Sequence, residues 1–219
     1  MKKFKSILMA SMLVMATALA GCSGDAADAP AGDAAAVPFT LGQWNDTTFE
    51  NEWLNMKIAA PADTTISSDE EIAQLMGVGA DILSQSTEGD TDALKNIADL
   101  ATSYGFMITN STGTFNSQLV YENLDVSGGP DTTEEEYANI VAETILQVPE
   151  LDYADVGRSE VEIAGKTFYK MELTMSGGLV AQDYYLYKQD NYMVSFIVTY
   201  TEDMKATSDA FVAGITTLK

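Results

Sequence analysis

The 219-residue sequence has no histidine and a single cysteine, at position 22. Without histidine, Ser-His-Asp and Cys-His catalytic arrangements and the usual zinc and iron sites are excluded. Neither a GxxxxGK[ST] motif nor a GxGxxG motif after a strand occurs, and no SxxK sequence is present for a Ser-Lys pair. We therefore expect no enzymatic activity, no cofactor and no metal site.

Basic residues are also scarce, since 11 Lys and Arg stand against 33 Asp and Glu, a net charge of −22. A surface of this sign repels nucleic acids and anionic lipid headgroups, so neither is expected as a partner. Paired carboxylates are the one catalytic option that the composition leaves open, as in a hydrolase. Two acidic stretches, residues 87–92 and 150–155, are candidates for calcium, although neither has the spacing of an EF-hand loop.

No segment after the N-terminus approaches 18 consecutive apolar residues, which a membrane-spanning helix requires. The N-terminus itself is typical of a secretory signal peptide. Lys2, Lys3 and Lys5 precede an apolar run at 7–20, which is too short to cross a bilayer. Removing these three lysines leaves 8 basic and 33 acidic residues, so the mature chain would have a net charge of −25.

The apolar run ends in Leu-Ala-Gly-Cys at 19–22, which resembles the lipobox of bacterial lipoproteins. The resemblance implies cleavage between Gly21 and Cys22 and attachment of diacylglycerol to the Cys22 thiol. Two acyl chains are enough for stable anchoring. The alternative is an ordinary secreted protein with a stray cysteine. We expect a lipid-anchored protein on the extracytoplasmic face of the cell membrane.

Three regions follow from this interpretation: a signal peptide at 1–21, the lipidated cysteine and a flexible tether at 22–38, and a single domain at 39–219. The tether is rich in Ala, Gly, Asp and Pro and lacks aromatic residues, so it cannot bury enough apolar surface to fold. The remaining chain is long enough to build one core without disulfide bonds.

The domain alternates between strand and helix patterns. Strands are predicted at 39–44, 54–61, 104–110 and 115–124, and helices at 67–86, from Thr91 onward and at 132–149. Capping boxes, Ser68 with Glu71 and Thr133 with Glu136, mark the start of two of these helices.

From residue 161 to residue 200 the hydrophobic pattern has a period of two, with turn residues at 164–165, 177–178 and 190–191. It predicts four hairpin-linked strands, followed by a closing helix. The last strand is apolar on both faces, and a strand of this kind is normally covered on both. The fold class is therefore predicted as α+β, an antiparallel sheet with helices packed on both faces.

Several stretches are similar to secreted lipoproteins of anaerobic Gram-positive bacteria. They are FENEWLNMKIAAPADTTISSDEEIAQLMG at 49–77, VYENL at 120–124, TTEEEY at 132–137 and DNYMVSFIVTYTED at 190–203. These proteins are in turn similar to the PsbP-like fold. The resemblance implies a PsbP-like α/β/α sandwich and a non-catalytic binding or assembly role, and it transfers no site residue.

Aromatic residues provide the candidate binding surface. Tyr185, Tyr187 and Tyr169 could form a platform for a sugar or a protein partner, because tyrosine is favoured at interfaces. The alternative is that these tyrosines pack in the core or on the sheet. Trp44 and Trp53 are expected to anchor the first strands to the core.

The function predicted from the sequence is a membrane-anchored, extracytoplasmic lipoprotein that acts as a non-enzymatic binding or accessory module of the cell envelope. Its partner would be another envelope protein or an extracellular polymer. The alternatives are a small-ligand-binding lipoprotein that serves a transporter and, with less support, a carboxylate-dependent hydrolase.

Overall fold

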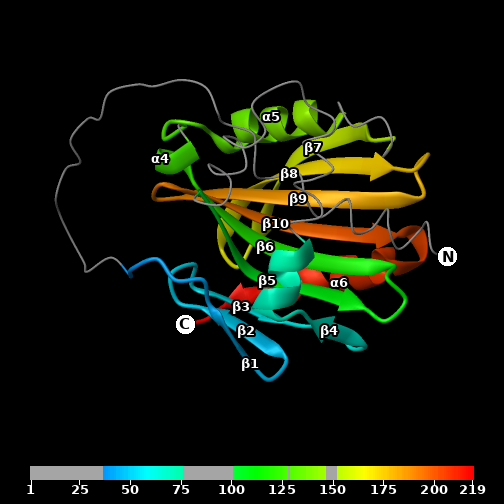
Figure 1. Ribbon diagram of the computed structural model, residues 1–219, viewed down its shortest axis with the longest axis horizontal. Coiled ribbons are helices and arrows are strands. Elements are labelled where there is room, and N and C mark those ends of the chain that lie inside the picture. Colours follow the sequence, from blue (N-terminus) through cyan, green and yellow to red (C-terminus); the bar gives the residue numbers. More distant parts are fainter. Residues whose placement is uncertain (1–36, 76–100, 128, 147–151) are drawn as a thin grey trace.

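A computed structural model of the chain describes residues 37–75, 101–127, 129–146 and 152–219. Within these residues, seven strands form an antiparallel sheet in the order β4-β5-β6-β10-β9-β8-β7 (Figure 1). Their bounds are Thr64–Ile66 for β4, Thr102–Asn110 for β5, Phe115–Asn123 for β6, Ala154–Ile163 for β7, Lys166–Met175 for β8, Val180–Gln189 for β9 and Tyr192–Thr201 for β10.

A second, smaller antiparallel sheet has the order β1-β2-β3-β11. Its strands are Gln43–Asn45, Thr48–Asn51, Met56–Ala59 and Thr216–Thr217. The described helical segments are α4 at Leu124–Ser127, α5 at Glu134–Leu146, the short 3-10 turn η3 at Glu202–Met204 and α6 at Lys205–Ala213. Residues 69–75 are also helical.

Each face of the large sheet has its own hydrophobic core. On one face, α5 contributes Tyr137, Val141 and Ile145 to a cluster with Tyr184 and Leu186 of β9. The other face is covered by the small sheet and by α6. The core residues on this side are Phe49, Ile58, Phe196, Tyr185 and Phe211 together with their neighbours. The predicted α+β fold with an antiparallel sheet covered on both faces is confirmed, and the second face carries a small sheet in addition to a helix.

The alternation of side chains along β10 explains the two cores. Val194, Phe196 and Val198 belong to the cluster under the small sheet, while Met193 and Ile197 belong to the cluster under α5. Successive side chains of a strand point to opposite faces, so a strand that is apolar throughout must be covered twice. The prediction made for this strand from its sequence is therefore confirmed.

Local signals place the turns and helix starts as expected. Ala164 and Gly165 both have positive φ, 51° and 74°, as a two-residue hairpin turn of type I′ requires. At the start of α5, the Thr133 N–H donates to Glu136 Oε2 at 3.0 Å, and the Glu136 N–H donates to Thr133 Oγ1 at 3.2 Å. Ser68 and Glu71 make the same reciprocal pair. The hydrogen bonds that Glu136 accepts from the backbone and side chain of Thr133 lower the pKa of Glu136.

Several differences from the sequence prediction concern strands. The strands predicted at 39–44 and 54–61 overlap β1 and β3, whereas β2, β4 and β11 were not predicted. β7 begins at Ala154 rather than near residue 161, because its first half is mostly exposed and polar and shows no apolar alternation. The helix predicted from Thr91 and the signal and tether at 1–36 lie outside the described residues.

Candidate functional site

The three tyrosines of the predicted platform do not share one surface. Tyr185 and Tyr187 belong to the side of the sheet that faces the small sheet and α6. Tyr169 lies directly opposite Leu186 in the register of β8 and β9, and it packs against the cluster under α5. Directly opposed residues share a face and adjacent residues do not. The structure therefore corrects the three-tyrosine platform, and ligand binding by Tyr169 or Tyr187 stays a prediction.

Tyr185 and Tyr187 also differ in burial. Tyr185 is 6% exposed, its ring centroid lies 5.9 Å from that of Phe196, and its hydroxyl donates to Asp183 Oδ2 at 3.3 Å. Tyr187 is half-buried, with its ring 5.2 Å from Phe168 and with Lys166 Nζ 4.9 Å from its centroid. Tyr185 therefore packs in the core, as the alternative to the platform holds, because the small sheet and α6 cover this part of the large sheet.

Asp183 is the centre of a buried charged cluster on the same face. Its Oδ2 atom accepts hydrogen bonds from the hydroxyls of Tyr185 and Tyr200, and it lies 3.0 Å from Lys170 Nζ. Lys170 Nζ also contacts Glu172 Oε1 at 2.8 Å. Burial raises the pKa of Asp183 against the opposing effect of Lys170. Burial alone would lower the pKa of Lys170, but its two carboxylate partners outweigh this and raise it.

This cluster is the closest arrangement to a carboxylate pair that the described core offers. Asp183 and Glu172 share one ammonium group, and Asp183 Oδ2 accepts from two tyrosine hydroxyls in addition to contacting Lys170. A catalytic pair needs one carboxyl group to donate a proton and another to act on substrate or water. The arrangement is that of a satisfied buried ion pair, which holds β8, β9 and β10 in place.

A second buried carboxyl group lies on the opposite face. Glu122 is 2% exposed, and the Tyr137 hydroxyl of α5 donates to its Oε2 atom at 2.5 Å. Burial raises the pKa of Glu122, although the hydrogen bonds from Tyr137 and Ser127 act in the other direction. This contact was not predicted from the sequence, and the one local signal was the position of Glu122 directly after the apolar residues 119–121.

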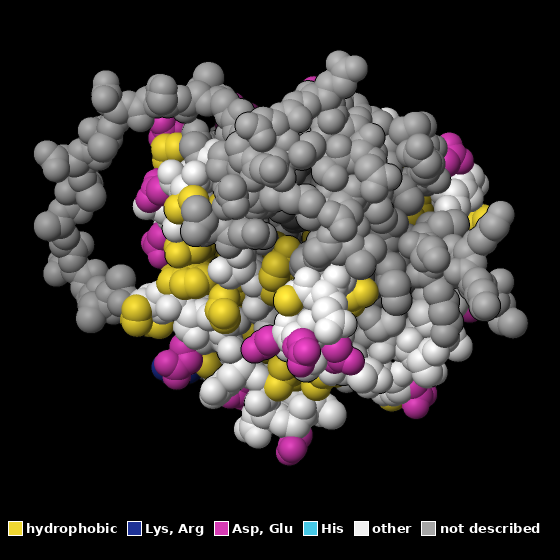
Figure 2. All heavy atoms as spheres, viewed as in Figure 1, with side chains coloured by type: hydrophobic (Ala, Val, Ile, Leu, Met, Phe, Trp, Pro, Cys, Tyr) yellow, Lys and Arg dark blue, Asp and Glu magenta, His cyan; other side chains and the backbone are white. Residues whose placement is uncertain are grey.

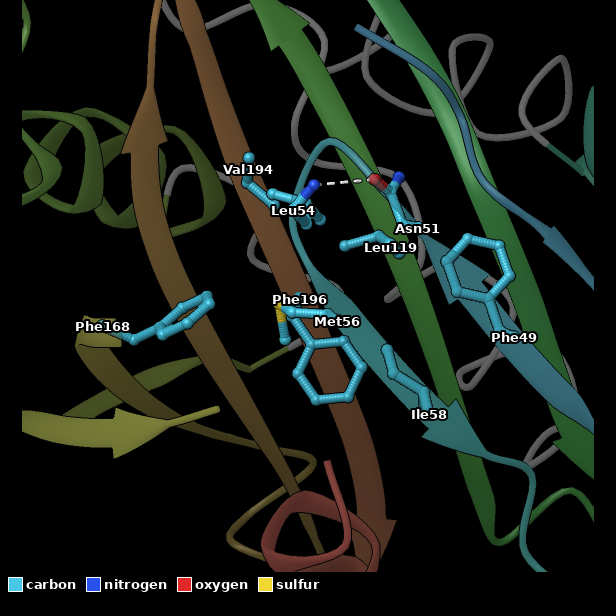
Figure 3. A pocket seen from close by; sticks show the side chains of 9 residues that line it. All are labelled: Phe49, Asn51, Leu54, Met56, Ile58, Leu119, Phe168, Val194 and Phe196. Atoms are coloured by element: carbon cyan, nitrogen blue, oxygen red, sulfur yellow. Dashed lines mark hydrogen bonds between the residues drawn. The ribbon is translucent and has the colours of Figure 1, made fainter. Parts of the chain in front are cut away.

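The seam between the two sheets contains a small apolar cavity of about 10 Å³ (Figure 3). It is lined by Phe49, Asn51, Leu54, Met56 and Ile58 from β2, β3 and their connection, and by Leu119, Phe168, Val194 and Phe196 from the large sheet. A space of this size is at the lower limit for one water molecule, and a water also needs polar partners. The seam is thus packed core rather than a ligand site.

Asn51, the first residue of the NEW sequence at 51–53, is fully buried beside this cavity. Its Oδ1 atom accepts from the Leu54 N–H at 2.8 Å, the dashed line in Figure 3. Its Nδ2 group donates to the Thr40 carbonyl and to the Tyr121 hydroxyl, both at 2.9 Å. These bonds tie the first residues of the domain to β6, so Asn51 has a structural role.

The two tryptophans behave as predicted. Trp53 is 5% exposed, and its indole N–H donates to Asp190 Oδ2 at 3.0 Å in the turn between β9 and β10. Trp44 packs edge-on against Phe49 and Phe106, with ring centroids 5.4 Å apart in each pair. Both tryptophans therefore anchor the small sheet and its connections to the core.

A row of polar residues crosses one end of the strands on the face that carries α5. Thr109, Asn116, Thr199 and Gln182 are neighbours in register on β5, β6, β10 and β9. The Gln182 side chain donates to Thr199 Oγ1 at 2.9 Å. Asn116 is fully buried, and its side-chain amide has no hydrogen-bond partner among the described residues.

The other candidate sites are only partly described. Cys22, Gly21 and the acidic stretch at 87–92 lie outside the described residues, as do the first two positions of 150–155. Asp155 is paired with Arg158. Within the described ranges, no three acidic or cysteine side chains converge in a way that could hold a metal ion. The helices of those same ranges include none that is long and apolar enough to cross a membrane.

Comparison with known proteins gives distant likenesses in structure. No protein-family model matches the chain, and no curated protein matches it. The solution structure of cyanobacterial PsbP (CyanoP) from Synechocystis sp. PCC 6803 is 9% identical, with a TM-score of 0.48 over 86% of this chain and 99% of that chain. The crystal structure of LpqN, involved in cell envelope biogenesis of Mycobacterium tuberculosis, is 11% identical, with a TM-score of 0.33 over 74% of this chain and 82% of that one. At these identities and TM-scores, neither likeness assigns a function to this chain.

Proposed function

We propose that the protein is an extracytoplasmic lipoprotein, held to the cell membrane through Cys22, that acts as a non-enzymatic binding or accessory module of the cell envelope. The observation that carries this proposal is the sequence Leu-Ala-Gly-Cys at 19–22 after a basic and apolar N-terminal segment. The only thiol of the chain lies where a lipid would be attached.

The described domain supports binding rather than chemistry. Its buried charged groups are satisfied by protein partners, as Asp183 is by Lys170 and two tyrosines, and Glu122 is by Tyr137. The seam between the sheets has room for about one water molecule at most. Acidic side chains dominate the charged residues of the chain, which favours a partner with basic groups.

The anchor is tested by expressing Cys22→Ala beside the parent protein in a bacterium that processes lipoproteins, with an alkyne-bearing fatty acid in the medium. We expect labelling and membrane association of the parent, no labelling of Cys22→Ala, and retention of its signal peptide. Ser23→Ala is the matched control and should be labelled like the parent. Equal labelling of Cys22→Ala and the parent would contradict the proposal.

The binding role is tested separately, by crosslinking on intact cells followed by capture of the protein and identification of its partners. We expect the parent to capture a defined envelope component. Capture that is unchanged by competition with the purified domain would indicate nonspecific recovery. Turnover of a substrate by the purified protein would contradict the non-enzymatic role.

A second candidate, the binding of a small uncharged ligand, is favoured by the buried amide of Asn116 in the polar row with Thr199 and Gln182. A buried amide without a partner costs about 1–3 kcal/mol, and a ligand amide or hydroxyl would remove this cost. The test is Asn116→Leu. If the Asn116 amide binds no ligand, Asn116→Leu should be more stable than the parent and bind the same partners. If the amide binds a small molecule, that molecule should raise the melting temperature of the parent but not of Asn116→Leu.

A further inference from the structure

The edge strand β7 is the longest exposed edge of the described fold. It is the last strand of the seven-stranded sheet, and among the described residues no strand pairs with its outer side (Figure 1). Ser159, Glu160 and Glu162 are exposed, so their side chains are open to solvent on both faces of the strand. The register with β8 is regular from Gly157 to Ile163, after a bulge between Asp155 and Gly157.

The hairpin turn determines which backbone groups of β7 point outward. In a two-residue hairpin the flanking residues, here Ile163 and Lys166, form a hydrogen-bonded pair. Hydrogen-bonded pairs alternate with non-hydrogen-bonded pairs along an antiparallel ladder. Glu162, Glu160 and Arg158 are therefore the residues whose N–H and C=O groups are directed away from β8. These groups are available to an added strand.

The side chains beside these outward groups form a surface suited to a cation. Glu160 lies directly opposite Tyr169 in the register, on the face that carries α5, and Glu162 lies opposite Thr167 on the same face. The Thr167 hydroxyl donates to Glu162 Oε1 at 2.6 Å, which orients that carboxylate. A carboxylate beside a tyrosine ring binds a Lys or Arg side chain through charge-assisted hydrogen bonds and a cation–π contact.

The charges at this edge decide between two possible occupants. Arg158, the nearby cation, is already paired with Asp155. A second copy of the chain would bring another net charge of −22 to the same edge. Figure 2 shows Asp and Glu side chains around the described part of one face and very few Lys or Arg side chains. Electrostatic complementarity therefore favours a basic segment over a second copy.

We infer that β7 binds an extended basic segment of a partner protein by strand addition, with a Lys or Arg side chain held between Glu160 and Tyr169. This inference rests on the proposed binding role and names the partner class and the surface. Main-chain hydrogen bonds to the outward groups supply affinity, and the alternating side chains supply specificity. Charged edge strands also serve to prevent aggregation, so the experiment has to separate these two roles.

The experiment measures binding of a fluorescent nine-residue peptide with alternating Lys and Val to the full chain in detergent, by anisotropy at 150 mM salt. The Glu160→Gln/Glu162→Gln variant should weaken binding at least tenfold. Glu135→Gln/Glu143→Gln removes the same charge from exposed positions of α5 and should change binding less than twofold. Equal effects of the two variants would overturn the inference, because the peptide would then respond only to total charge.

Strand addition itself is tested by comparing Glu160→Pro with Glu160→Gln. Both remove the carboxylate, but only proline removes the outward N–H, which an edge strand tolerates. Proline should reduce peptide binding at least a further fivefold. Equal binding of these two variants would overturn strand addition.

Amide hydrogen exchange on the parent protein covers the case in which the proline variant fails to fold. The amides of Arg158, Glu160 and Glu162 should exchange at least tenfold more slowly when the peptide is bound, and unchanged rates would overturn the inference. A free protein that is dimeric by light scattering, and that Glu160→Pro converts to a monomer, would instead identify a second copy as the occupant. Failure of the lipid-labelling experiment would refute the anchor without affecting these measurements.

Discussion

Replacing Asn51 by alanine should strongly lower the free energy of unfolding of the domain. The buried Asn51 side chain satisfies the Leu54 N–H, the Thr40 carbonyl and one acceptor position of the Tyr121 hydroxyl. Leu54 is 1% exposed, so its N–H would lose its partner without access to water, at a cost of about 1–3 kcal/mol. Thr40 is half-buried, and its carbonyl can be hydrated in part.

The energetic losses at the Leu54 N–H, the Thr40 carbonyl and the Tyr121 hydroxyl do not add fully. The Tyr121 hydroxyl keeps its hydrogen bond to the Leu41 carbonyl at 3.1 Å, so it loses a donor but not all of its partners. We expect Asn51→Ala to lower the free energy of unfolding by about 3 kcal/mol, most of it from the Leu54 N–H. Tyr121→Phe should cost about 1 kcal/mol or slightly more, because it removes one buried hydroxyl and leaves Asn51 its other two bonds.

Urea unfolding followed by circular dichroism and tryptophan fluorescence measures these losses. Asn45→Ala is the control, since Asn45 is exposed in β1 and should change stability by less than about 0.5 kcal/mol. The double variant at Asn51 and Tyr121 should lose less than the sum of the single losses, because the two residues share a bond. A loss below about 1 kcal/mol for Asn51→Ala would refute the structural role assigned to the NEW sequence.

The remaining predictions concern burial, pH and metal. Tyr184→Ala and Tyr185→Ala should each lower the free energy of unfolding by about 3–5 kcal/mol, because both side chains are buried. Tyr187→Ala should lower it by only about 1–2 kcal/mol, because Tyr187 is half-buried. Equal losses for Tyr185→Ala and Tyr187→Ala in chemical denaturation would contradict this difference in burial. Burial raises the native pKa of Glu122 above 4.5, so its contribution to stability is present below that pH and is lost as the pH rises through the native pKa. Glu122→Gln, which keeps an acceptor for Tyr137, should therefore raise the melting temperature at pH 7 and leave it unchanged near pH 4, and an equal change at both pH values would contradict this assignment. Melting temperatures in EDTA and in micromolar calcium should agree at matched ionic strength, and a rise of many degrees with calcium alone would reveal a site.

The sequence predicted the elements whose local and tertiary signals agree. The hairpin strands β8, β9 and β10 have alternating apolar residues and turn residues at their ends, and their side chains pack as that alternation requires. The capping boxes at Ser68 and Thr133 depend on residues only three positions apart, so no long-range contact is needed to form them. Such features depend on residues close to one another in the sequence or joined by a short turn.

Other features depend on contacts that the local pattern does not contain. β11 has two residues and exists because it pairs with β3, which lies more than 150 positions earlier in the chain. The side chains of Tyr185 and Tyr187 point to the same face of β9. Tyr185 is covered because it packs against Phe196 and its neighbours, whereas Tyr187 lies nearer the end of the strand. The partner of Glu122 is on α5, and no spacing within β6 indicates it.

The position of a binding surface follows from how the large sheet is covered. Among the described residues, α5 lies on one face, and the small sheet and α6 lie on the other, so the sheet backbone is open only at its two edges. One edge strand, β4, has three residues, too few to hold an added strand firmly, whereas β7 has ten. The alternation that buries Ile163 under the small sheet directs Glu160 and Glu162 to the opposite, exposed side beside Tyr169. Specific binding of a partner to this edge would therefore depend on very few side chains of β7. Charge reversal at Glu160 alone should be enough to prevent binding of a basic segment.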